Sequence, residues 1–349
     1  MNTLQGTFKE FCESKVTLYF THRDVDAKVN ANHLVYENQR TGLKKSVELN
    51  RIRRIVFVGI PGFTGDAIYH LCRRIIPIDF LDIKGEPVGQ VMTYDPGVYE
   101  TNVSKQEKFI SSSDSLEVAR EVIMAKVENS AELLRRRLSE DELPDWKSCK
   151  RLLNEASSID ELRGAEGISA KYYFSKWNDI LKSFKWEGRH YHPALGPINT
   201  MLSMGYTLMY NRMSSGLRAA GMNPRLGFFH MIRGRHSALA SDLIEPFRNF
   251  VDAAVLRMIS LGMVKPDQFT TDEYGRSIID DNDCYHTLIN EFEKMFSKEC
   301  KLFRKTDNHW HSVVRSINDH IDDLAFSFSR YLKSNTPLHA MRVRPCKDI

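Results

Sequence analysis

The hydrophobic pattern of this sequence changes character once along the chain. Residues 1–92 carry short runs of β-branched and aromatic residues, which are typical of β-strands: VTLYF (16–20), HLVY (33–36) and IVFV (55–58). Turns are expected at Thr41-Gly42 and near Gly85, and one short helix is expected at about 64–75. This part of the chain predicts a small, sandwich-like β domain.

Beyond this region the pattern becomes helical. The segment TYDPGVYETN (93–102) has the composition of a linker, and after it apolar positions recur every three or four residues. Helices are predicted at about 114–138, 148–163, 168–184, 197–220, 238–263, 284–297 and 306–333. The expected fold class is therefore α+β, with a β domain at 1–92, a linker at 93–106 and a larger all-α domain at 107–349.

Composition excludes several classes of protein. The 349 residues are 42% hydrophobic and 27% charged, as in a globular chain with a sizeable core, and the net charge of +4 is only mildly basic. The six cysteines form no CxxC pair, which argues against a disulfide framework or a thiolate zinc site. Neither an apolar signal core nor a membrane-length apolar run is present, so a cytoplasmic protein that makes no membrane contact is expected.

A glycine-rich stretch, GIPGFTG (59–65), follows a strand and opens a helix. Such a turn is able to cradle a phosphate, but this one lacks both the GxGxxG spacing and a terminal Gly-Lys-Ser/Thr. The favoured interpretation is a tight strand-to-helix turn, with Thr64 as the helix cap.

Residues 227–248, GFFHMIRGRHSALASDLIEPFR, hold the most unusual chemistry of the chain. Ser237 is a good helix N-cap, and an apolar stripe follows it at spacings of three and four. Asp242 and Glu245 stand three residues apart, so they are neighbours beside this stripe. Two close carboxylates repel one another unless positive charge lies with them.

His230 precedes this helix by a short loop, so the chain holds the imidazole close to both carboxylates. One nitrogen among several oxygens suits Mn²⁺ or Mg²⁺ better than structural Zn²⁺, and Arg233 and Arg235 add positive charge suited to phosphate. Two interpretations remain open on these residues alone. The group binds a metal ion, or His230 is an ordinary histidine and the acids stabilise the helix N-terminus.

Glu166 is a further candidate carboxylate, in RGAEGISAKYYF (163–174). The flanking Gly164 and Gly167 suggest a constrained backbone that approaches another part of the molecule closely. The alternative is a first-turn glutamate stabilised by the helix dipole.

Four segments together resemble one known family, in the family's own order. They are GAEG with YYF (164–167 and 172–174), PINTMLSMGY (197–206), GMNPRLGFFH (221–230) and SALASDLIEPFR (237–248). They are similar to those of the CRISPR-associated adaptation endonuclease family, the integrase subunit that inserts new spacers. The resemblance covers about residues 15–260 and also fits a β domain followed by a helical catalytic domain.

The resemblance implies a metal site with an acid, a histidine and a second acid, which fall on Glu166, His230 and Glu245. Asp242 matches a further acid of the family, which either supports the metal or lies close to it. Many members carry aspartate where Glu245 stands, so the resemblance leaves open whether Asp242 or Glu245 is the direct ligand. The implied cofactor is Mg²⁺ or Mn²⁺.

The implied activity is the cutting and joining of double-stranded DNA, namely a spacer precursor and a repeat target. A 3′-hydroxyl would attack a phosphodiester. The implied partners are a second copy of the chain, bound through the β domain, and a small second CRISPR-associated adaptation protein. The candidate phosphate contacts are Arg225, Arg233, Arg235 and Arg248.

Two other functions compete with this one. A transposase of a mobile element uses the same fold, and a DNA-binding scaffold would keep the fold without the chemistry. Histidine pairs raise further metal candidates, but loop structure or a DNA contact is favoured for His236. An ordinary role without a metal is favoured for His190 with His192 and for the HWH of residues 309–311. The basic end of the chain, HAMRVRPCKDI, is expected to be flexible or to contact nucleic acid.

Overall fold

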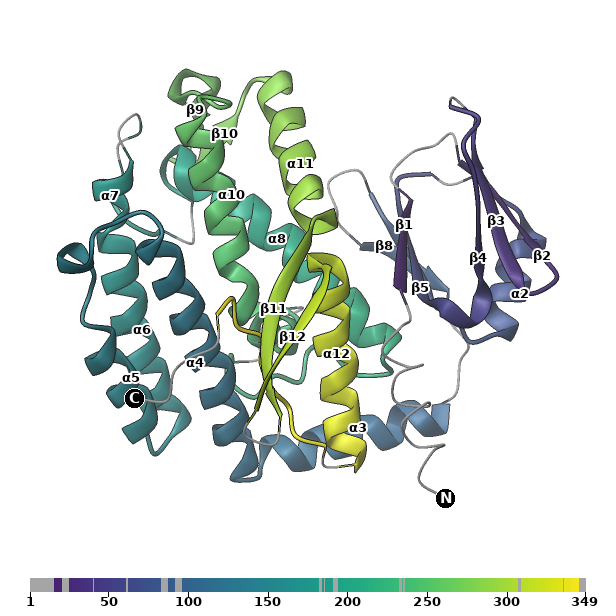
Figure 1. Cartoon of the computed structure of the whole chain (residues 1–349), viewed down its shortest axis with the longest axis horizontal. Helices are drawn as coiled ribbons and strands as arrows, with labels where there is room; N and C mark the ends of the chain where they lie inside the picture. Colours follow the sequence, from purple (N-terminus) through teal and green to yellow (C-terminus); the bar gives the residue numbers. More distant parts are fainter. Residues whose placement is uncertain are drawn as a thin grey trace. The chain divides into compact units, whose positions relative to one another are not determined.

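The chain divides into two compact units, residues 1–100 and 101–349. The computed structural model describes residues 16–20, 25–39, 41–60, 62–82, 87–91, 96–181, 184, 186–190, 194–231, 234, 236–306, 309–334 and 336–344. Figure 1 shows strands gathered in the first unit and helices dominating the second. This arrangement confirms the predicted β-then-α fold class.

Two four-stranded sheets form the first unit. One has the order β1-β5-β7-β8, with β8 antiparallel to β7 and the others parallel, and the second has the order β4-β3-β2-β6. The strands are β1 (Val16–Phe20), β2 (Val25–Asn30), β3 (His33–Asn38), β4 (Lys44–Glu48), β5 (Ile52–Val58), β6 (Gly62–Phe63), β7 (Ile78–Leu81) and β8 (Pro87–Val91). A 3₁₀ turn η1 (Leu49–Arg51) joins β4 to β5.

Aromatic side chains from both sheets share one core, as expected of a sandwich. Phe20 of β1 lies 5.1 Å from Tyr36 of β3, and Phe57 of β5 lies 4.4 Å from Phe63 of β6, measured between ring centroids. Alternation of side chains along each strand turns these rings to the same inner side.

The glycine-rich turn is the predicted strand-to-helix turn. Thr64 caps α2 (Gly65–Arg73) by accepting a 3.2 Å hydrogen bond from the Ala67 amide. A Cβ at Gly62 would lie 2.5 Å from Oδ1 of Asp26 and 2.9 Å from the Val25 carbonyl oxygen. Glycine at position 62 therefore lets β6 pair closely with β2.

Helices make up most of the second unit. They are α3 (Pro96–Ile110), α4 (Asp114–Arg135), α5 (Trp146–Glu155), α6 (Ile159–Ser175), α7 (Trp177–Ile180), α8 (Gly196–Ala219), α9 (Ala238–Ile244), α10 (Arg248–Ser260), α11 (Asn282–Ser297) and α12 (Ile317–Ser334). Three 3₁₀ turns lie between them: η2 (Glu140–Glu142), η3 (Glu245–Phe247) and η4 (Pro266–Gln268). The division between the units falls within α3, which replaces most of the linker expected at 93–106.

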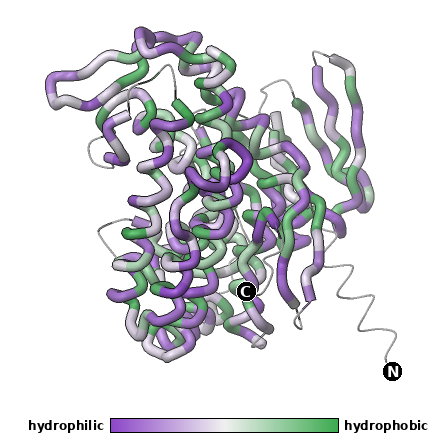
Figure 2. Tube along the Cα trace, turned by 60° about the vertical axis from the view of Figure 1, so that its left-hand side comes forward, coloured by the Kyte–Doolittle hydropathy of each residue, from purple (hydrophilic) through white to green (hydrophobic). Residues whose placement is uncertain are grey.

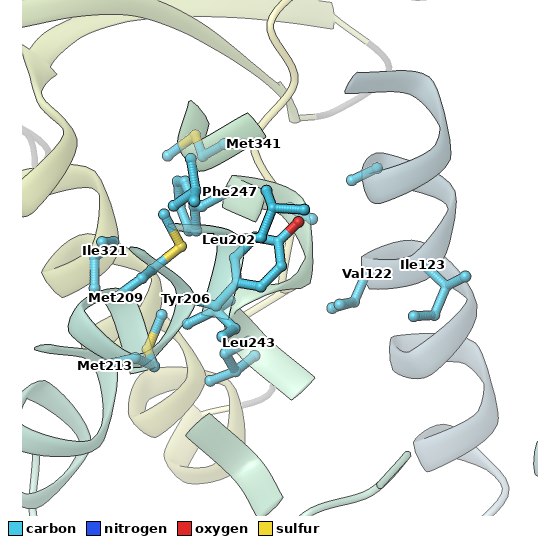
Figure 3. Close-up of a cluster of buried hydrophobic side chains, with 14 of the residues drawn as sticks. Val122, Ile123, Leu202, Tyr206, Met209, Met213, Leu243, Phe247, Ile321 and Met341 are labelled. Atoms are coloured by element: carbon cyan, nitrogen blue, oxygen red, sulfur yellow. The ribbon is translucent and has the colours of Figure 1, made fainter. Parts of the chain in front are cut away.

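Helix α8 is buried on several sides at the centre of this unit. Figure 3 shows Met209 and Met213 of α8 clustered with Leu243 of α9 and Ile321 of α12. A Cβ at Gly205 of α8 would lie 2.5 Å from Val251 and 2.7 Å from Phe292, so glycine permits close packing there.

The structure corrects four predicted features of the helical region. Residues 306–333 are not one helix, because β11 (Glu299–Thr306) and β12 (His309–Ser316) form a hairpin before α12. A short hairpin of β9 (Phe269–Thr271) and β10 (Ser277–Ile279) also interrupts the expected all-α domain. Helix α6 continues through Gly164 and Gly167, so Glu166 lies mid-helix, and a Cβ at either glycine would meet nothing within 4 Å.

The fourth correction concerns the helix expected at 238–263. It is interrupted by the 3₁₀ turn η3 at Glu245-Pro246-Phe247. Proline lacks an N–H and clashes with the preceding helical turn, so it favours a break at this point. The break lies at a residue that the sequence singles out for its chemistry.

No helix of the described part of the chain is both long and apolar enough to span a bilayer. Figure 2 shows hydrophobic and hydrophilic positions mixed along the helices.

The segment after α12 packs against the helical unit instead of extending from it. Arg342 is 5% exposed and pairs with Glu121 and Glu128 of α4, and its backbone forms a two-way bridge with Phe303 of β11. Its N–H and carbonyl hydrogen bonds to Phe303 are both 2.8 Å long. This arginine is therefore part of the folded interior, contrary to the expectation of a flexible or nucleic-acid-binding end; residues 345–349 lie outside the described residues.

Replacing Arg342 with methionine leaves two acids without their buried cation, so we expect the free energy of unfolding to fall by about 3 kcal/mol. The exposed Arg344 lies 3.8 Å from Glu132, and Arg344→Met should cost less than about 1 kcal/mol. Urea denaturation followed by tryptophan fluorescence tests both, because all four tryptophans lie in the second unit. Equal losses in the two variants would contradict a special role for Arg342.

Candidate active site

Asp242 organises the loop that carries His230. Its carboxylate is fully buried and accepts hydrogen bonds from the backbone amides of Phe228, Phe229 and His230, at 2.7, 3.1 and 2.8 Å. A Cβ at Gly227 would lie 2.8 Å from Oδ2 of Asp242 and 2.7 Å from the Ala238 Cβ. The absence of a side chain at position 227 lets the loop wrap this closely around α9.

The same carboxylate orients the His230 imidazole. Nδ1 of His230 lies 2.6 Å from Oδ1 of Asp242, while Nε2 lies 3.7 Å from Oε1 of Glu245. With Nδ1 donating to Asp242, Nε2 carries the lone pair that a metal ion requires. Asp242 therefore contacts the Nδ1 side of the His230 ring, and Glu245 lies on the Nε2 side.

Arg163 connects this loop to the helix that carries Glu166. Its Nε donates a 2.8 Å hydrogen bond to the carbonyl oxygen of Phe229, one residue before His230. Its guanidinium also lies 5.7 Å from the centre of the Phe229 ring. Because Arg163 and Glu166 are three apart on α6, this contact sets His230 and Glu166 relative to one another.

A lysine lies between the two glutamates. Nζ of Lys126, on α4, is 2.5 Å from Oε1 of Glu166 and 2.7 Å from Oε2 of Glu245. Burial would raise the pKa of Glu245, but the nearby positive charges of Arg248 and Lys126, joined by His230 when its ring is protonated, outweigh it and lower the pKa to about 2. Glu245 is therefore held as a carboxylate at any physiological pH.

Arg248 supports Glu245 from the other side. Its Nε lies 3.0 Å from Oε2 of Glu245, and its guanidinium is 4.7 Å from the centre of the Tyr206 ring. These contacts place Arg248 in the wall of the site rather than on an open surface. Arg225 is exposed and donates to the Gly234 carbonyl oxygen at 2.7 Å, whereas Arg233 and Arg235 lie outside the described residues.

These groups line one cavity of about 280 Å³. Its polar lining consists mainly of Lys126, Glu166, His230, Glu245, Arg248 and Asp252, and its aromatic lining of Trp146, Tyr173, Phe174 and Tyr206. Elements far apart in sequence thus bring the predicted Glu166, His230 and Glu245 to a common space.

The donor set of this cavity fits a hard divalent cation. Two carboxylates and one imidazole nitrogen face it, and the buried Oε2 of Glu245 accepts no well-aligned hydrogen bond although two cations lie close to it. Within the described ranges, no three side chains of histidine, cysteine, aspartate or glutamate are close enough together to hold one ion directly. The Lys126 ammonium occupies the space between Glu166 and Glu245 instead.

The structure adds site residues that the sequence analysis missed. Asp252 is buried and accepts hydrogen bonds from the hydroxyls of Tyr206 and Tyr173, the latter at 2.8 Å. Burial raises the pKa of Asp252 to about 6, although both tyrosine hydrogen bonds oppose the rise. The sequence pattern around Asp252 does not mark it as a site residue. Lys126 could have been found, because it follows the buried Val122 and Ile123 by four and three residues and so lies on the helix face turned to the core.

The other candidate histidines either have structural contacts of their own or lie outside the described residues. His236 stacks on Tyr210, with 5.3 Å between ring centroids, and its Nε2 lies 2.9 Å from the Ser241 hydroxyl. His309 and His311 lie on β12, opposite Thr306 and Arg304. His192 is not among the described residues.

The fold and the cavity define a two-unit α+β protein whose helical unit presents an acid, a histidine and a second acid. The family model described as CRISPR associated protein Cas1 matches residues 18–294. The chain belongs to the Cas1 family, as the four sequence segments indicate.

Curated relatives and solved structures agree with this assignment. Over 299 residues the chain is 28% identical to the CRISPR-associated exonuclease Cas4/endonuclease Cas1 fusion of Geobacter sulfurreducens, covering 81% of this chain and 53%, about half, of that longer protein. Over 264 residues it is 28% identical to CRISPR-associated endonuclease Cas1 1 of Thermus thermophilus, covering 74% of this chain and 81% of the relative.

Two solved structures share the fold. A chain of a partial Cas6-RT-Cas1--Cas2 complex matches with a TM-score of 0.77 and 19% identity, covering 92% of this chain and 96% of that one. A casposase bound to integration product matches with a TM-score of 0.71 and 22% identity, covering 95% and 99%.

The raised pKa of Asp252 predicts a pH-dependent stability. Between the ordinary pKa of 3.8 and about 6, the folded state keeps a proton that the unfolded state has lost. The stabilisation is thus complete below about pH 4 and disappears as the pH rises to about 6. Asp252→Asn, which cannot ionise, should gain about 2 kcal/mol in free energy of unfolding relative to the wild type between about pH 4.5 and 7.

Urea denaturation at the two pH values measures this difference, with the exposed Asp267→Asn as the control. A constant difference between Asp252→Asn and the wild type at both values would contradict the raised pKa.

Proposed function

We propose that this Cas1-family protein is a divalent-metal-dependent DNA endonuclease and integrase of CRISPR adaptation. The observation that carries the proposal is the convergence of Glu166, His230 and Glu245 on one cavity, with His230 aimed into it by Asp242. The endonuclease names of the relatives agree with this chemistry.

Mg²⁺ or Mn²⁺ is the proposed cofactor, with Glu166, Glu245 and Nε2 of His230 as its ligands. When bound, the ion supplies Lewis-acid stabilisation of the negative charge that develops on the attacked phosphate. Asp242 accepts a hydrogen bond from Nδ1–H of His230 and so keeps Nε2 free for coordination. This geometry favours Glu245 over Asp242 as the second acidic ligand.

The proposed reaction joins DNA strands without a covalent enzyme intermediate. The oxygen of a 3′-hydroxyl forms a bond to phosphorus, the existing phosphorus–oxygen bond to the leaving strand breaks, and the hydroxyl proton passes to the leaving oxygen or to solvent. The exposed Arg225 is the candidate phosphate contact that the structure describes; Arg233 and Arg235 are proposed from sequence alone. Arg248 is assigned instead to holding Glu245 in place.

The proposed partners are double-stranded DNA, a second copy of the chain and a small second adaptation protein. The similar structures come from a complex with Cas2 and from a casposase bound to integration product. A cytoplasmic location fits these partners. The casposase match keeps the mobile-element transposase as the second candidate, because that enzyme shares the fold.

Single substitutions of the three proposed ligands should each abolish joining. We expect Glu166→Gln, His230→Ala and Glu245→Gln to reduce joining at least about 100-fold, because each removes a donor to the ion that stabilises the transition state. The assay mixes protein, a short duplex with free 3′-hydroxyls and supercoiled plasmid, with Mn²⁺ or Mg²⁺, with and without the second adaptation protein.

Glu155→Gln, an exposed glutamate of α5, is the matched control and should keep wild-type joining. Plasmids with and without a repeat array separate CRISPR adaptation from transposition, since only the former requires the repeat. DNA binding without joining under either metal would support a scaffold instead.

Asp242→Asn tests whether Asp242 orients His230 through Nδ1 and does not bind the metal ion itself. Asparagine offers one carbonyl oxygen for contacts that two carboxylate oxygens share in the wild type. We expect Mn²⁺ affinity, measured by calorimetry, to fall about 10- to 100-fold while binding remains detectable. Complete loss of binding in a folded variant would make Asp242 a direct ligand.

A further inference from the structure

Lys126 is the cation that connects the two acidic ligands. It comes from α4, whereas Glu166 belongs to α6 and Glu245 to η3. Its Nζ lies within 2.7 Å of one oxygen of each, at 2.5 Å and 2.7 Å. The lysine therefore occupies a position bounded by the same oxygens that the proposed ion requires.

The local charges make this position selective for a cation. At the side chain, Glu245 is 2% exposed and Glu166 is 21% exposed, so water screens Glu245 very little and Glu166 only partly. The two negative charges therefore repel one another unless a cation lies between them. Arg248 neutralises Glu245 from the side of Tyr206, where its guanidinium lies against the ring. Lys126 is the cation that joins both acids.

Arg248 and Lys126 differ in how easily their charged groups can move away from the two glutamates. Arg248 lies against an aromatic ring, whereas Lys126 carries a compact ammonium on a flexible four-carbon stem. Lys126 lines the cavity of about 280 Å³, so open space adjoins its stem.

We propose that Lys126 is a positioning residue that holds Glu166 and Glu245 together before metal binds and is displaced by the incoming divalent ion. The inference rests on the proposed function, in which these two glutamates are metal ligands. In this proposal, binding of one Mg²⁺ or Mn²⁺ exchanges the Lys126 ammonium for the metal ion between the two glutamates. The metal affinity of the protein is then set partly by the cost of removing Lys126.

Replacing Lys126 with methionine removes the competitor and preserves the length of the stem. Because the charge-assisted hydrogen bond to Glu166 and the ion pair with Glu245 must be broken to displace the lysine, we expect Mn²⁺ to bind Lys126→Met about tenfold more tightly than the wild type. Lys126→Arg, which keeps the charge, should stay close to wild-type affinity. Mn²⁺ titration followed by electron paramagnetic resonance measures each dissociation constant without any DNA.

Thermal unfolding supplies a second readout that a merely structural lysine would not move in the same way. In EDTA, Lys126→Met should unfold at a lower temperature than the wild type, because its two carboxylates repel without a cation between them. Saturating Mn²⁺ should close that gap. A gap that is equal with and without Mn²⁺ would overturn the inference.

Lys150→Met is the matched control. Lys150 is partly buried to a similar degree and pairs with Glu128 at 2.8 Å, but it does not line the cavity. It should leave Mn²⁺ affinity unchanged. If Lys126→Met does not fold, Lys126→Gln and Lys126→Arg replace it, and an affinity for Mn²⁺ that is higher in glutamine than in arginine supports the exchange.

The failures of the two proposals are distinguishable. If neither the wild type nor any variant binds Mn²⁺, the proposed metal site fails and the exchange with it. If the wild type binds Mn²⁺ and His230→Ala does not, while Lys126→Met binds with unchanged or weaker affinity, the metal site stands and the exchange alone is overturned.

Discussion

The buried carboxylate of Asp242 is the constraint on which the geometry of the site depends. A fully buried charge is costly unless hydrogen bonds replace its water, and here three consecutive backbone amides and an imidazole N–H do so. The same contacts force the chain to curl over α9 and stop the ring of His230 from turning. Gly227 makes this approach sterically possible. One interaction therefore fixes the course of the loop, the orientation of the ring and the choice of its free nitrogen.

The other charged side chains of the site are arranged around the ring of Tyr206. The Arg248 guanidinium lies over the Tyr206 ring, and the Tyr206 hydroxyl donates a hydrogen bond to Asp252. The arginine in turn stabilises Glu245. Because one tyrosine contacts both a cation and an acid, the negative charge that lines the cavity is already neutralised by a neighbouring positive charge. Such a preformed electrostatic arrangement avoids reorganisation when charge develops during a reaction.

Sequence reasoning predicted the fold class because strand-like and helical patterns occupy separate parts of the chain, residues 1–92 and those that follow. Motif resemblance singled out Glu166, His230 and Glu245, which line one cavity. Prediction from the sequence failed where local pattern and tertiary packing disagree. The glycines flanking Glu166 read as a break, yet buried neighbours in α6 outweigh their low helix propensity. Strand β12 fell within the helix predicted at 306–333 because its sequence, HWHSVVRS, lacks a clear alternation of apolar and polar residues. The role of Lys126 depends on a neighbour 119 positions later, Glu245, and no local spacing encodes that contact.

Asn129 gives the site a dependence on chain synthesis. Its amide donates at 2.8 Å to the carbonyl oxygen of Pro246, in the turn that bears Glu245, and at 3.0 Å to the carbonyl oxygen of Met341. Its own carbonyl oxygen accepts from the Val343 amide at 2.8 Å. Met341 follows Asn129 by 212 residues, so a ribosome must translate the chain as far as residues 341–343 before the turn acquires this support. A nascent chain that already contains all the acids and the histidine still lacks this support, and the turn that bears Glu245 would be fully held only after residues 341–343 have left the ribosome.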